Sequence, residues 1–454
     1  MGVGVLVAVA ILLPAIGGAQ PVTQMAAGYY HSLFLKSDGS LWGMGQNLNG
    51  QLGDGTFNNA NLPEPIVASN VTAIAAGGYH SLFLKSDGSL WAMGRDANGQ
   101  LGDGTNINAA YGINLPELIM ASNVTAVAAG LYYTLFLKGD GSVWGMGDNQ
   151  YGQLGDGTYG NAPYYDTNLP DQTLVTSNVT AIATGYYHSL LLKSDGSLWG
   201  MGQNLNGQLG DGTFNNVNLP EPIVASNVTA IAAGGYHSLF LKSDGSLWSM
   251  GFDTDGQLGD GVYRTNAPYN GTNRPEQIVA NDVTAIAAGG NHSLFLKSDG
   301  SLWAMGKNLN GQLGDGTNGN QFHTNRPAQI IAGGVAAVSA GQLHSLFIQN
   351  DGSLWGMGDN QRAQLGEIYH SLVNQPEPIL AAYNYISSQR LSGDMQLSFV
   401  GVAGANYALD RAFNLSPADW VPQSTNAADS IGVLVFTNAP VIDTNNFWRI
   451  RSVP

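Results

Sequence analysis

The sequence predicts an all-β fold, a seven-bladed β-propeller followed by a small β-sandwich-like C-terminal module. Three observations predict the propeller. Two short apolar runs joined by Asp-Gly recur along the chain, the tryptophan of the second run returns at intervals of 49 to 55 residues, and no repeat shows a helical hydrophobic period. Self-similarity of this length is typical of propellers and solenoids. Seven four-stranded units closed into a ring would also leave no exposed sheet edge.

One repeat, residues 80–105, shows how each strand is predicted. Residues 81–85 form a short apolar run, an Asp-Gly pair follows as a hairpin turn, and residues 90–94 return. The apolar residues are nearly continuous, which indicates that both faces of the sheet are covered. A glycine-rich loop then folds back with Leu101 as its apolar anchor. The fourth strand, residues 61–67 in the first repeat, contains prolines that cannot donate to a ladder, so it is predicted at the outer edge of its blade.

Two residue types recur once in each repeat and are predicted to be structural. The tryptophans of the returning strand are predicted to lie in the core of the blades: Trp42, Trp91, Trp144, Trp199, Trp248, Trp303 and Trp355. The histidines that open the second strand are His31, His80, His188, His237, His292 and His344, with Tyr133 in the third repeat. Histidines one blade apart are too distant to converge on a metal ion. Each is therefore predicted to hydrogen-bond the backbone and fix its own blade. Which terminal strand closes the ring stays open.

The shared pattern also carries a family resemblance. A-A-G-x-x-H-S-L-F-L-K-x-D-G-S-L-W-x-M-G-x-N-x-x-G-Q-L-G-D-G, repeated over roughly residues 22–380, resembles the regulator of chromosome condensation repeat. The resemblance implies a seven-bladed propeller over residues 21–382. It implies little about function, because the family includes exchange factors, photoreceptors, inhibitors and interaction platforms.

The first 20 residues are predicted to be a signal peptide. Residues 3–16 form an apolar run, and Gly17-Gly18-Ala19 offers the small residues of a cleavage site. No Lys or Arg precedes the run, so an uncleaved anchor and an apolar tail without a targeting role remain alternatives. We therefore expect an extracytoplasmic protein, secreted or in the cell envelope, with no membrane span in the mature chain.

Composition narrows the classes of partner. The formal net charge is −16 at pH 7, which disfavours binding to the phosphate backbone of nucleic acids. Cysteine is absent, so the fold needs no disulfide and offers no thiol chemistry. We expect a monomer.

The loops that follow the glycine-rich segments differ between repeats and are the predicted binding site. They are residues 105–116, 158–170, 262–275, 317–327 and 367–376. Because they occupy the same place in each blade, we expect them on one face of the disc. Tyrosine gives contact area at low entropic cost, although long surface loops also tolerate drift in sequence. The predicted binding residues are Tyr111, Tyr159, Tyr164, Tyr165, Tyr263, Arg264, Tyr269, Phe322, His323 and Tyr369.

Catalytic and metal motifs are missing from the sequence. It contains no G-x-x-x-x-G-K-[ST], no nucleophile elbow and no H-E-x-x-H, so we predict neither an enzyme nor a cofactor. Asp253-Thr254-Asp255-Gly256 with Asp260 resembles a calcium loop, but the bidentate glutamate is missing and we predict no metal.

Beyond the repeats, residues 383–393 are predicted to be a linker and residues 394–454 a separate β module. Short strand-like runs separated by turn residues are typical of a small sandwich. They lie at residues 395–403, 407–411, 420–421, 432–438 and 447–453. This part resembles modules appended to exported bacterial proteins, which implies attachment or secretion.

Together these features predict an exported, non-catalytic scaffold that binds a protein or glycan through the variable loops. One alternative, implied by the family resemblance, is a regulator like a guanine-nucleotide exchange factor. The sequence shows neither a distinct wedge-like insertion nor a basic arm for that role. A structural protein of the envelope or matrix is the other alternative.

Overall fold

The computed structural model describes residues 20–105, 112–160, 166–172, 177–265, 269–319, 323–366 and 371–380, and the backbone of six strands between residues 387 and 453. The first 28 strands of the chain form seven four-stranded sheets. This arrangement confirms the all-β, seven-bladed prediction. The predicted signal peptide lies outside the described residues, apart from Gln20. No helix in the described part of the chain has the length and apolar character needed to cross a bilayer.

Each blade consists of four strands that are consecutive in the sequence. Blades 1 and 2 contain β1 (Val22–Ala27), β2 (His31–Lys36), β3 (Leu41–Gly45), β4 (Ala60–Val67), β5 (Val71–Ala76), β6 (His80–Lys85), β7 (Leu90–Gly94) and β8 (Ile113–Met120). Blades 3 and 4 contain β9 (Val124–Ala129), β10 (Tyr133–Lys138), β11 (Val143–Asp148), β12 (Asp166–Gln172), β13 (Val179–Thr184), β14 (His188–Lys193), β15 (Leu198–Gly202) and β16 (Val217–Val224).

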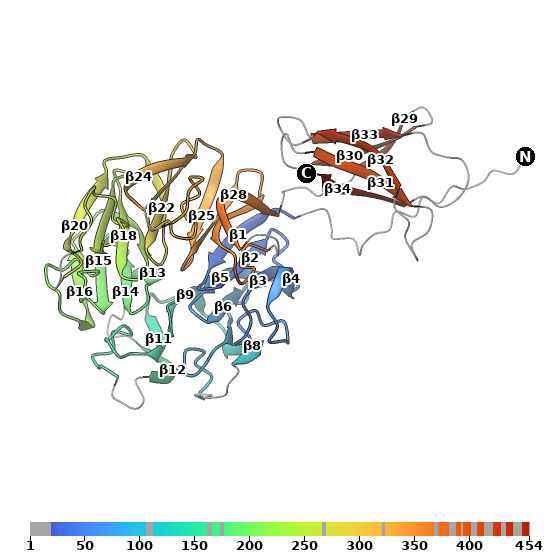
Figure 1. The fold of residues 1–454 in the computed structure, drawn as a ribbon. Coiled ribbons are helices and arrows are strands. Elements are labelled where there is room, and N and C mark those ends of the chain that lie inside the picture. Colours follow the sequence, from blue (N-terminus) through green and yellow to red (C-terminus); the bar gives the residue numbers. More distant parts are fainter. Residues whose placement is uncertain are drawn as a thin grey trace, which may run out of the picture. The chain divides into compact units, whose positions relative to one another are not determined.

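Blades 5 to 7 repeat the same order. They contain β17 (Val228–Ala233), β18 (His237–Lys242), β19 (Leu247–Phe252), β20 (Gly271–Val279), β21 (Val283–Ala288), β22 (His292–Lys297), β23 (Leu302–Gly306), β24 (Thr324–Ile331), β25 (Val335–Ala340), β26 (His344–Gln349), β27 (Leu354–Asp359) and β28 (Leu372–Leu380). The proline-containing fourth strand lies at the periphery of its blade, as predicted (Figure 1).

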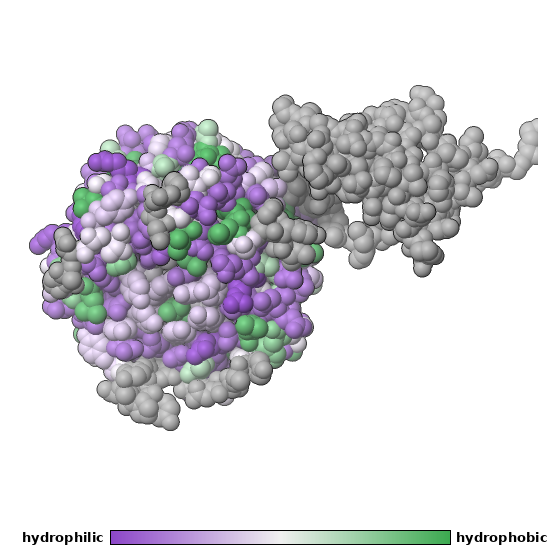
Figure 2. All heavy atoms as spheres, in the orientation of Figure 1, coloured by the Kyte–Doolittle hydropathy of each residue, from purple (hydrophilic) through white to green (hydrophobic). Residues whose placement is uncertain are grey.

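Apolar residues of one blade pack against the next blade, so the core lies between the sheets. Leu82, Leu84 and Leu101 of blade 2 share a buried cluster with Phe136 and Met146 of blade 3. Leu101 is completely buried, which confirms its role as the anchor of the glycine-rich loop. Burial of both faces explains why the second strands are apolar almost throughout. On the side of the propeller seen in Figure 2, hydrophobic residues form only small separate patches among hydrophilic ones.

The burial of the tryptophans differs from the predicted position in the core of the blades. The ring of Trp42 stacks on the buried Phe34 across the ladder, but Trp42 is only half-buried. Its indole nitrogen donates to Ser40 Oγ at 2.9 Å, and Lys36 Nζ lies 3.7 Å from the ring centroid. The indole N–H needs a partner, and the lysine covers the outer ring face as a cation–π contact. All seven tryptophans are half-buried, and a lysine covers the ring in six of them; in blade 7 Gln349 stands at the position of the lysine.

The histidines are structural, but they join neighbouring blades and do not bond the backbone of their own. His31 Nε2 lies 2.9 Å from Ser81 Oγ of the next blade, and Ser81 donates its one proton to the Gln51 carbonyl at 2.7 Å. His31 must therefore be the donor to Ser81. The equivalent pairs are His80–Thr134, His188–Ser238, His237–Ser293, His292–Ser345 and His344–Ser32.

Blade 3 keeps this link although a tyrosine replaces the histidine. Tyr133 Oη lies 3.0 Å from Ser189 Oγ and donates to the His188 carbonyl. Burial lowers the pKa of His31 to about 4, so the imidazole stays neutral. The pair between His344 and Ser32 joins blade 7 to blade 1. Since every blade consists of consecutive strands, the ring closes by contacts between blades 7 and 1 and needs no exchanged terminal strand.

The C-terminal strands form two three-stranded sheets in a separate compact unit. One sheet has the order β29-β30-β33 and the other the order β32-β31-β34. The strands are β29 (Ser387–Leu391), β30 (Asp394–Val400), β31 (Asn406–Ala412), β32 (Val421–Ala427), β33 (Val433–Asn438) and β34 (Phe447–Val453). β29 falls within the predicted linker. The predicted sandwich and the boundaries near residues 382 and 393 stay predictions.

Candidate functional site

Two sets of connections meet on one face of the propeller, which we call the loop face. In every blade the turn from the first to the second strand and the loop from the third to the fourth emerge at the same end, because the strands are antiparallel. A backbone hydrogen bond ties the two together: Gln46 N donates to the Tyr30 carbonyl at 2.8 Å, and Arg95 N donates to the Tyr79 carbonyl at 2.9 Å. The variable loops and the turns nearest the axis therefore form one surface.

Three predicted binding tyrosines lie on this face and each contacts a neighbouring blade. Tyr159, Tyr263 and Tyr269 are 42%, 44% and 48% exposed. Tyr159 Oη donates to the Asn216 carbonyl at 3.0 Å, and Tyr263 Oη donates to the His323 carbonyl at 2.9 Å. The Tyr269 ring stacks on Phe214 with centroids 3.8 Å apart. These contacts join blades 3 to 4, 5 to 6 and 4 to 5. Tyr111, Tyr164, Tyr165, Phe322 and Tyr369 lie outside the described residues.

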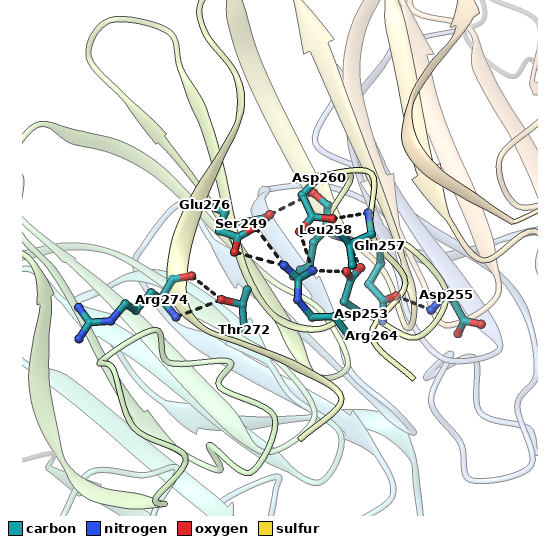
Figure 3. A network of polar contacts seen from close by, with 11 residues as sticks. Ser249, Asp253, Asp255, Gln257, Leu258, Asp260, Arg264, Thr272, Arg274 and Glu276 are labelled. Carbon is teal, nitrogen blue, oxygen red and sulfur yellow. Dashed lines mark hydrogen bonds and ion pairs between the residues drawn. The ribbon is translucent and has the colours of Figure 1, made fainter. Parts of the chain in front are cut away.

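Arg264 forms ion pairs with carboxylates of its own blade, blade 5 (Figure 3). Its Nη1 atom lies 2.5 Å from both Asp253 Oδ2 and Asp260 Oδ2, and Nη2 lies 3.2 Å from Glu276. Two aspartates of the calcium-like segment thus face a guanidinium. Sequence reasoning proposed Arg264 as a binding residue, but these three carboxylates already occupy its donors.

His323 is also paired within the protein. Its Nδ1 atom lies 3.1 Å from Asp255 Oδ1, the remaining aspartate of the calcium-like segment. Asn291 Nδ2 donates to the other oxygen of Asp255 at 2.9 Å. His323 and Asn291 both belong to blade 6, so Asp255 of blade 5 contributes a further link between these blades.

A second group of aromatic residues, which the sequence analysis did not propose as a site, surrounds the axis on the same face. We call it the tyrosine crescent. Its members occupy the first-to-second-strand turns of blades 1 to 5: Tyr29, Tyr30, Tyr79, Tyr132, Tyr186, Tyr187 and Tyr236. The two positions between the repeated glycine and histidine differ from blade to blade while their neighbours stay constant. That contrast within the repeats was the signal that could have revealed them.

Four crescent rings are nearly parallel. The centroids of Tyr132 and Tyr79 are 5.9 Å apart, those of Tyr79 and Tyr29 are 5.5 Å apart, and those of Tyr29 and Tyr186 are 6.2 Å apart. The angles between these ring planes are 12°, 17° and 22°. Blades 1 and 4 are not neighbours, so the contact between Tyr29 and Tyr186 crosses the axis of the ring. The remaining rings meet edge-on, as Tyr186 and Tyr236 do at 5.3 Å.

Beneath these rings lies an axial cavity of about 110 Å³. The Ala-Gly ends of the inner strands form its wall, and Tyr29, Leu131, Tyr186 and Gln342 contribute the larger side chains. The wall is fixed by backbone hydrogen bonds between blades, such as Tyr29 N to the Gly77 carbonyl at 3.2 Å. A side chain at Gly77 would fall 2.5 Å from His80 Cε1 and 2.6 Å from the Gly130 carbonyl, so these positions require glycine.

The hydroxyls of Tyr29, Tyr186 and Tyr236 stay protonated at physiological pH. Burial raises the pKa of Tyr29 to about 12, and the neighbouring Tyr30 and Tyr79 add to the rise. Burial also raises the pKa of Tyr186 and Tyr236. Neutral phenols both donate and accept hydrogen bonds. The arrangement therefore suits recognition, and within the described ranges no three His, Asp or Glu side chains are placed to hold a metal ion.

Comparison with known proteins matches the repeats to one family of domains. The model of the RCC1-like domain matches residues 6–270, and models of the regulator of chromosome condensation repeat match residues 283–312, 335–364 and 299–348. The X-linked retinitis pigmentosa GTPase regulator homolog of Caenorhabditis elegans is 31% identical over 80% of this chain and 22% of its own length. The ultraviolet-B receptor UVR8 of Arabidopsis thaliana is 28% identical over 76% of this chain and 55% of its own length.

Solved structures agree with the fold. Human WBSCR16 matches with a TM-score of 0.63 and 26% identity, over 72% of this chain and 86% of its own. Yeast RCC1 (Prp20) in its complex with Kap60 matches with a TM-score of 0.65 and 21% identity, over 80% of this chain and 85% of its own. The chain spans only about a fifth to just over half of the length of the curated relatives it matches.

Proposed function

Because the chain belongs to the family of RCC1-like domains, we propose that it is an exported, non-catalytic scaffold that binds a protein or glycan on its loop face. Members of this family are regulators or binding scaffolds. The observation that carries the proposal is the concentration of half-exposed and exposed tyrosines on one face of a rigid ring.

The exposed tyrosines are held ready for contact. Tyr159 and Tyr263 each donate a hydrogen bond to a neighbouring blade, and Tyr269 stacks on Phe214. These tyrosine side chains would lose little further entropy when a partner covers them, because their rings are already ordered. Large aromatic surfaces held in place are typical of recognition sites.

A protein partner has a precedent among relatives. The yeast structure contains RCC1 (Prp20) with Kap60, and Prp20p has been studied for its binding to Gsp1p and histones. For this chain the identity of a protein partner is open. Nucleotide-release assays against small GTPases would reveal the alternative, exchange activity.

Export is supported by the apolar run of residues 3–16 and the small residues after it. Fractionation of producing cells and N-terminal sequencing of the mature protein test it. We expect a mature chain that begins near Gln20 outside the cytoplasm. Recovery of the uncleaved chain in the cytoplasm would contradict export without touching the binding proposal.

A loop exchange tests the binding proposal, and the chain supplies the template. In blade 1 the connection between the third and fourth strands, residues 46–59, ends in the short segment of residues 57–59, while five blades carry longer loops at this place. We replace all five long loops by that segment and compare capture of envelope proteins, secreted proteins and glycans by the two chains. Capture by the natural chain alone is the expected result, while the loop-exchanged chain still unfolds cooperatively, at a lower midpoint because it lacks Arg264. Equal capture by both chains would place the partner elsewhere.

A further inference from the structure

We propose that the axial cavity and the tyrosine crescent bind the terminal sugar residue of a neutral glycan. The inference rests on the proposed binding function and deepens it, since it names the ligand class and the part of the loop face that takes it. Four features carry it: polar atoms without partners, an uncharged lining, aromatic rings and a rigid wall.

Two buried polar atoms at the cavity lack a hydrogen-bond partner among the described residues. They are the hydroxyl of Tyr186 and the side-chain oxygen of Gln342. Leaving such groups unsatisfied costs free energy in folding, so their retention at a cavity wall favours a ligand that completes them. Both atoms are enclosed in this structure, so the ligand reaches them when the stacked rings of Tyr29 and Tyr186 move apart. One can donate and both can accept, which matches the hydroxyl groups of a sugar.

The lining is uncharged. Among the described residues that line the cavity, all are alanine, glycine, threonine, leucine, tyrosine or glutamine. A peptide terminus or an anionic sugar would lose its hydration there without gaining an opposite charge. The net charge of −16 further disfavours anionic glycans. A neutral polyhydroxyl ligand meets neither penalty.

The rings and the wall supply shape. Tyr29 and Tyr186 bring two nearly parallel rings across the axis, and Tyr79 extends the row outward. Aromatic surfaces cover the apolar C–H faces of a sugar while the phenol hydroxyls meet its polar edge. Gln342 N donates to the Gly28 carbonyl at 3.2 Å, which extends the backbone bonding of the wall from blade 7 to blade 1. Such a preformed wall limits the entropy cost of binding.

Calorimetric titration of the full chain with cellotetraose, chitotetraose and mannotetraose tests the proposal. The variants are Tyr186→Phe and Gln342→Met, each of which removes one unpartnered polar group and keeps the side-chain volume similar. Thr229→Val is the matched control, because it removes a hydroxyl from the other end of an inner strand, where Thr229 is exposed.

We expect at least one saccharide to bind, each site variant to weaken its binding about tenfold, and the control to bind like the natural chain. The thermal midpoint of Tyr186→Phe should stay the same or rise, because an unsatisfied buried hydroxyl has been removed. A purely structural role for that hydroxyl would instead lower the midpoint.

Two results would overturn the inference: no binding of any of the three saccharides, or equal affinity of Tyr186→Phe and the natural chain. The loop-exchanged chain separates this inference from the proposed function. If it binds the saccharide as the natural chain does, the axial site is supported independently of the variable loops. If only a protein is captured, and only by the natural loops, the binding function stands while the glycan site is lost.

Discussion

Blades 2 and 5 differ from the other five blades at one buried position in the glycine-rich loop. Asp96 and Asp253 lie there, where the other blades have an asparagine. In blade 4, Asn204 accepts from Leu209 N at 2.9 Å and donates to Asp211 at 3.0 Å. An ionised aspartate can perform the first task but not the second, because it has no proton to donate.

The two blades compensate for this loss in different ways. In blade 5, Arg264 contacts both Asp253 and Asp260 and takes the place of the amide donor. Burial raises the pKa of Asp253 to about 7, as it does for Asp96, but the direct contact of Asp253 with the guanidinium favours the ionised carboxylate. In blade 2 the corresponding segment, residues 105–116, contains no Lys or Arg.

In blade 2 a proton on Asp96 can take the place of the missing cation. Burial raises the pKa of Asp96 to about 7, and the charge of Asp103 adds to the rise. When protonated, Asp96 can donate to a carboxylate as an asparagine does. The comparison teaches that one substitution in a repeat can be tolerated in two ways, through a cation or through protonation.

The largest expected effect comes from removal of the cation. Arg264→Met leaves Asp253, Asp260 and Glu276 together without a positive charge. We expect it to lower the free energy of unfolding by about 2–4 kcal/mol, the cost of breaking a largely buried ion pair on one side. Urea unfolding at pH 7 measures it. Arg274→Met in the same blade is the control, since Arg274 is exposed, and an equal loss in both variants would argue against the ion-pair explanation.

A second change should restore most of that loss. In Arg264→Met with Asp253→Asn, the new amide is placed to donate to Asp260, as Asn204 donates to Asp211. We expect the double variant to be more stable than Arg264→Met alone by about 1–2 kcal/mol, the value of a hydrogen bond to a charged group. A double variant no more stable than the single one would show that blade 5 cannot adopt the arrangement of blade 4.

Blade 2 should respond to pH. Because the pKa of Asp96 is raised in the folded state, the fold binds more protons than the unfolded chain, and the associated stability is lost as pH rises toward and above 7. Asp96→Asn removes this dependence. We expect the gain to be about 1–2 kcal/mol larger at pH 8 than at pH 5, because stability falls as pH rises from the unfolded pKa near 3.8 through the folded pKa of about 7. Urea unfolding at both pH values, expressed as variant minus natural chain, checks it.

Part of this picture could be predicted from the sequence. Regular intervals of Trp42 and its counterparts fixed the number of blades, because each copy must pack in the same way. Periodicity within a repeat does not reveal which blade a side chain contacts, so the bond from His31 to Ser81 was missed. The partners of Arg264 and the meeting of Tyr29 with Tyr186 depend on loop conformation and on ring closure, which a linear pattern does not contain.

The smallest effect is the one that decides whether the two blades truly differ. Asp253→Asn keeps Arg264, which then retains Asp260 and Glu276 as partners. We expect a loss of about 0.5–1 kcal/mol at pH 8, typical of removing one contact from a partly exposed ion network. Asp96→Asn should give a gain under the same conditions. If Asp253→Asn gave an equal gain, Asp253 would lack an effective counter-charge despite Arg264, and protonation would explain both blades. Opposite signs would instead establish the cation as the compensation in blade 5 and the proton as the compensation in blade 2.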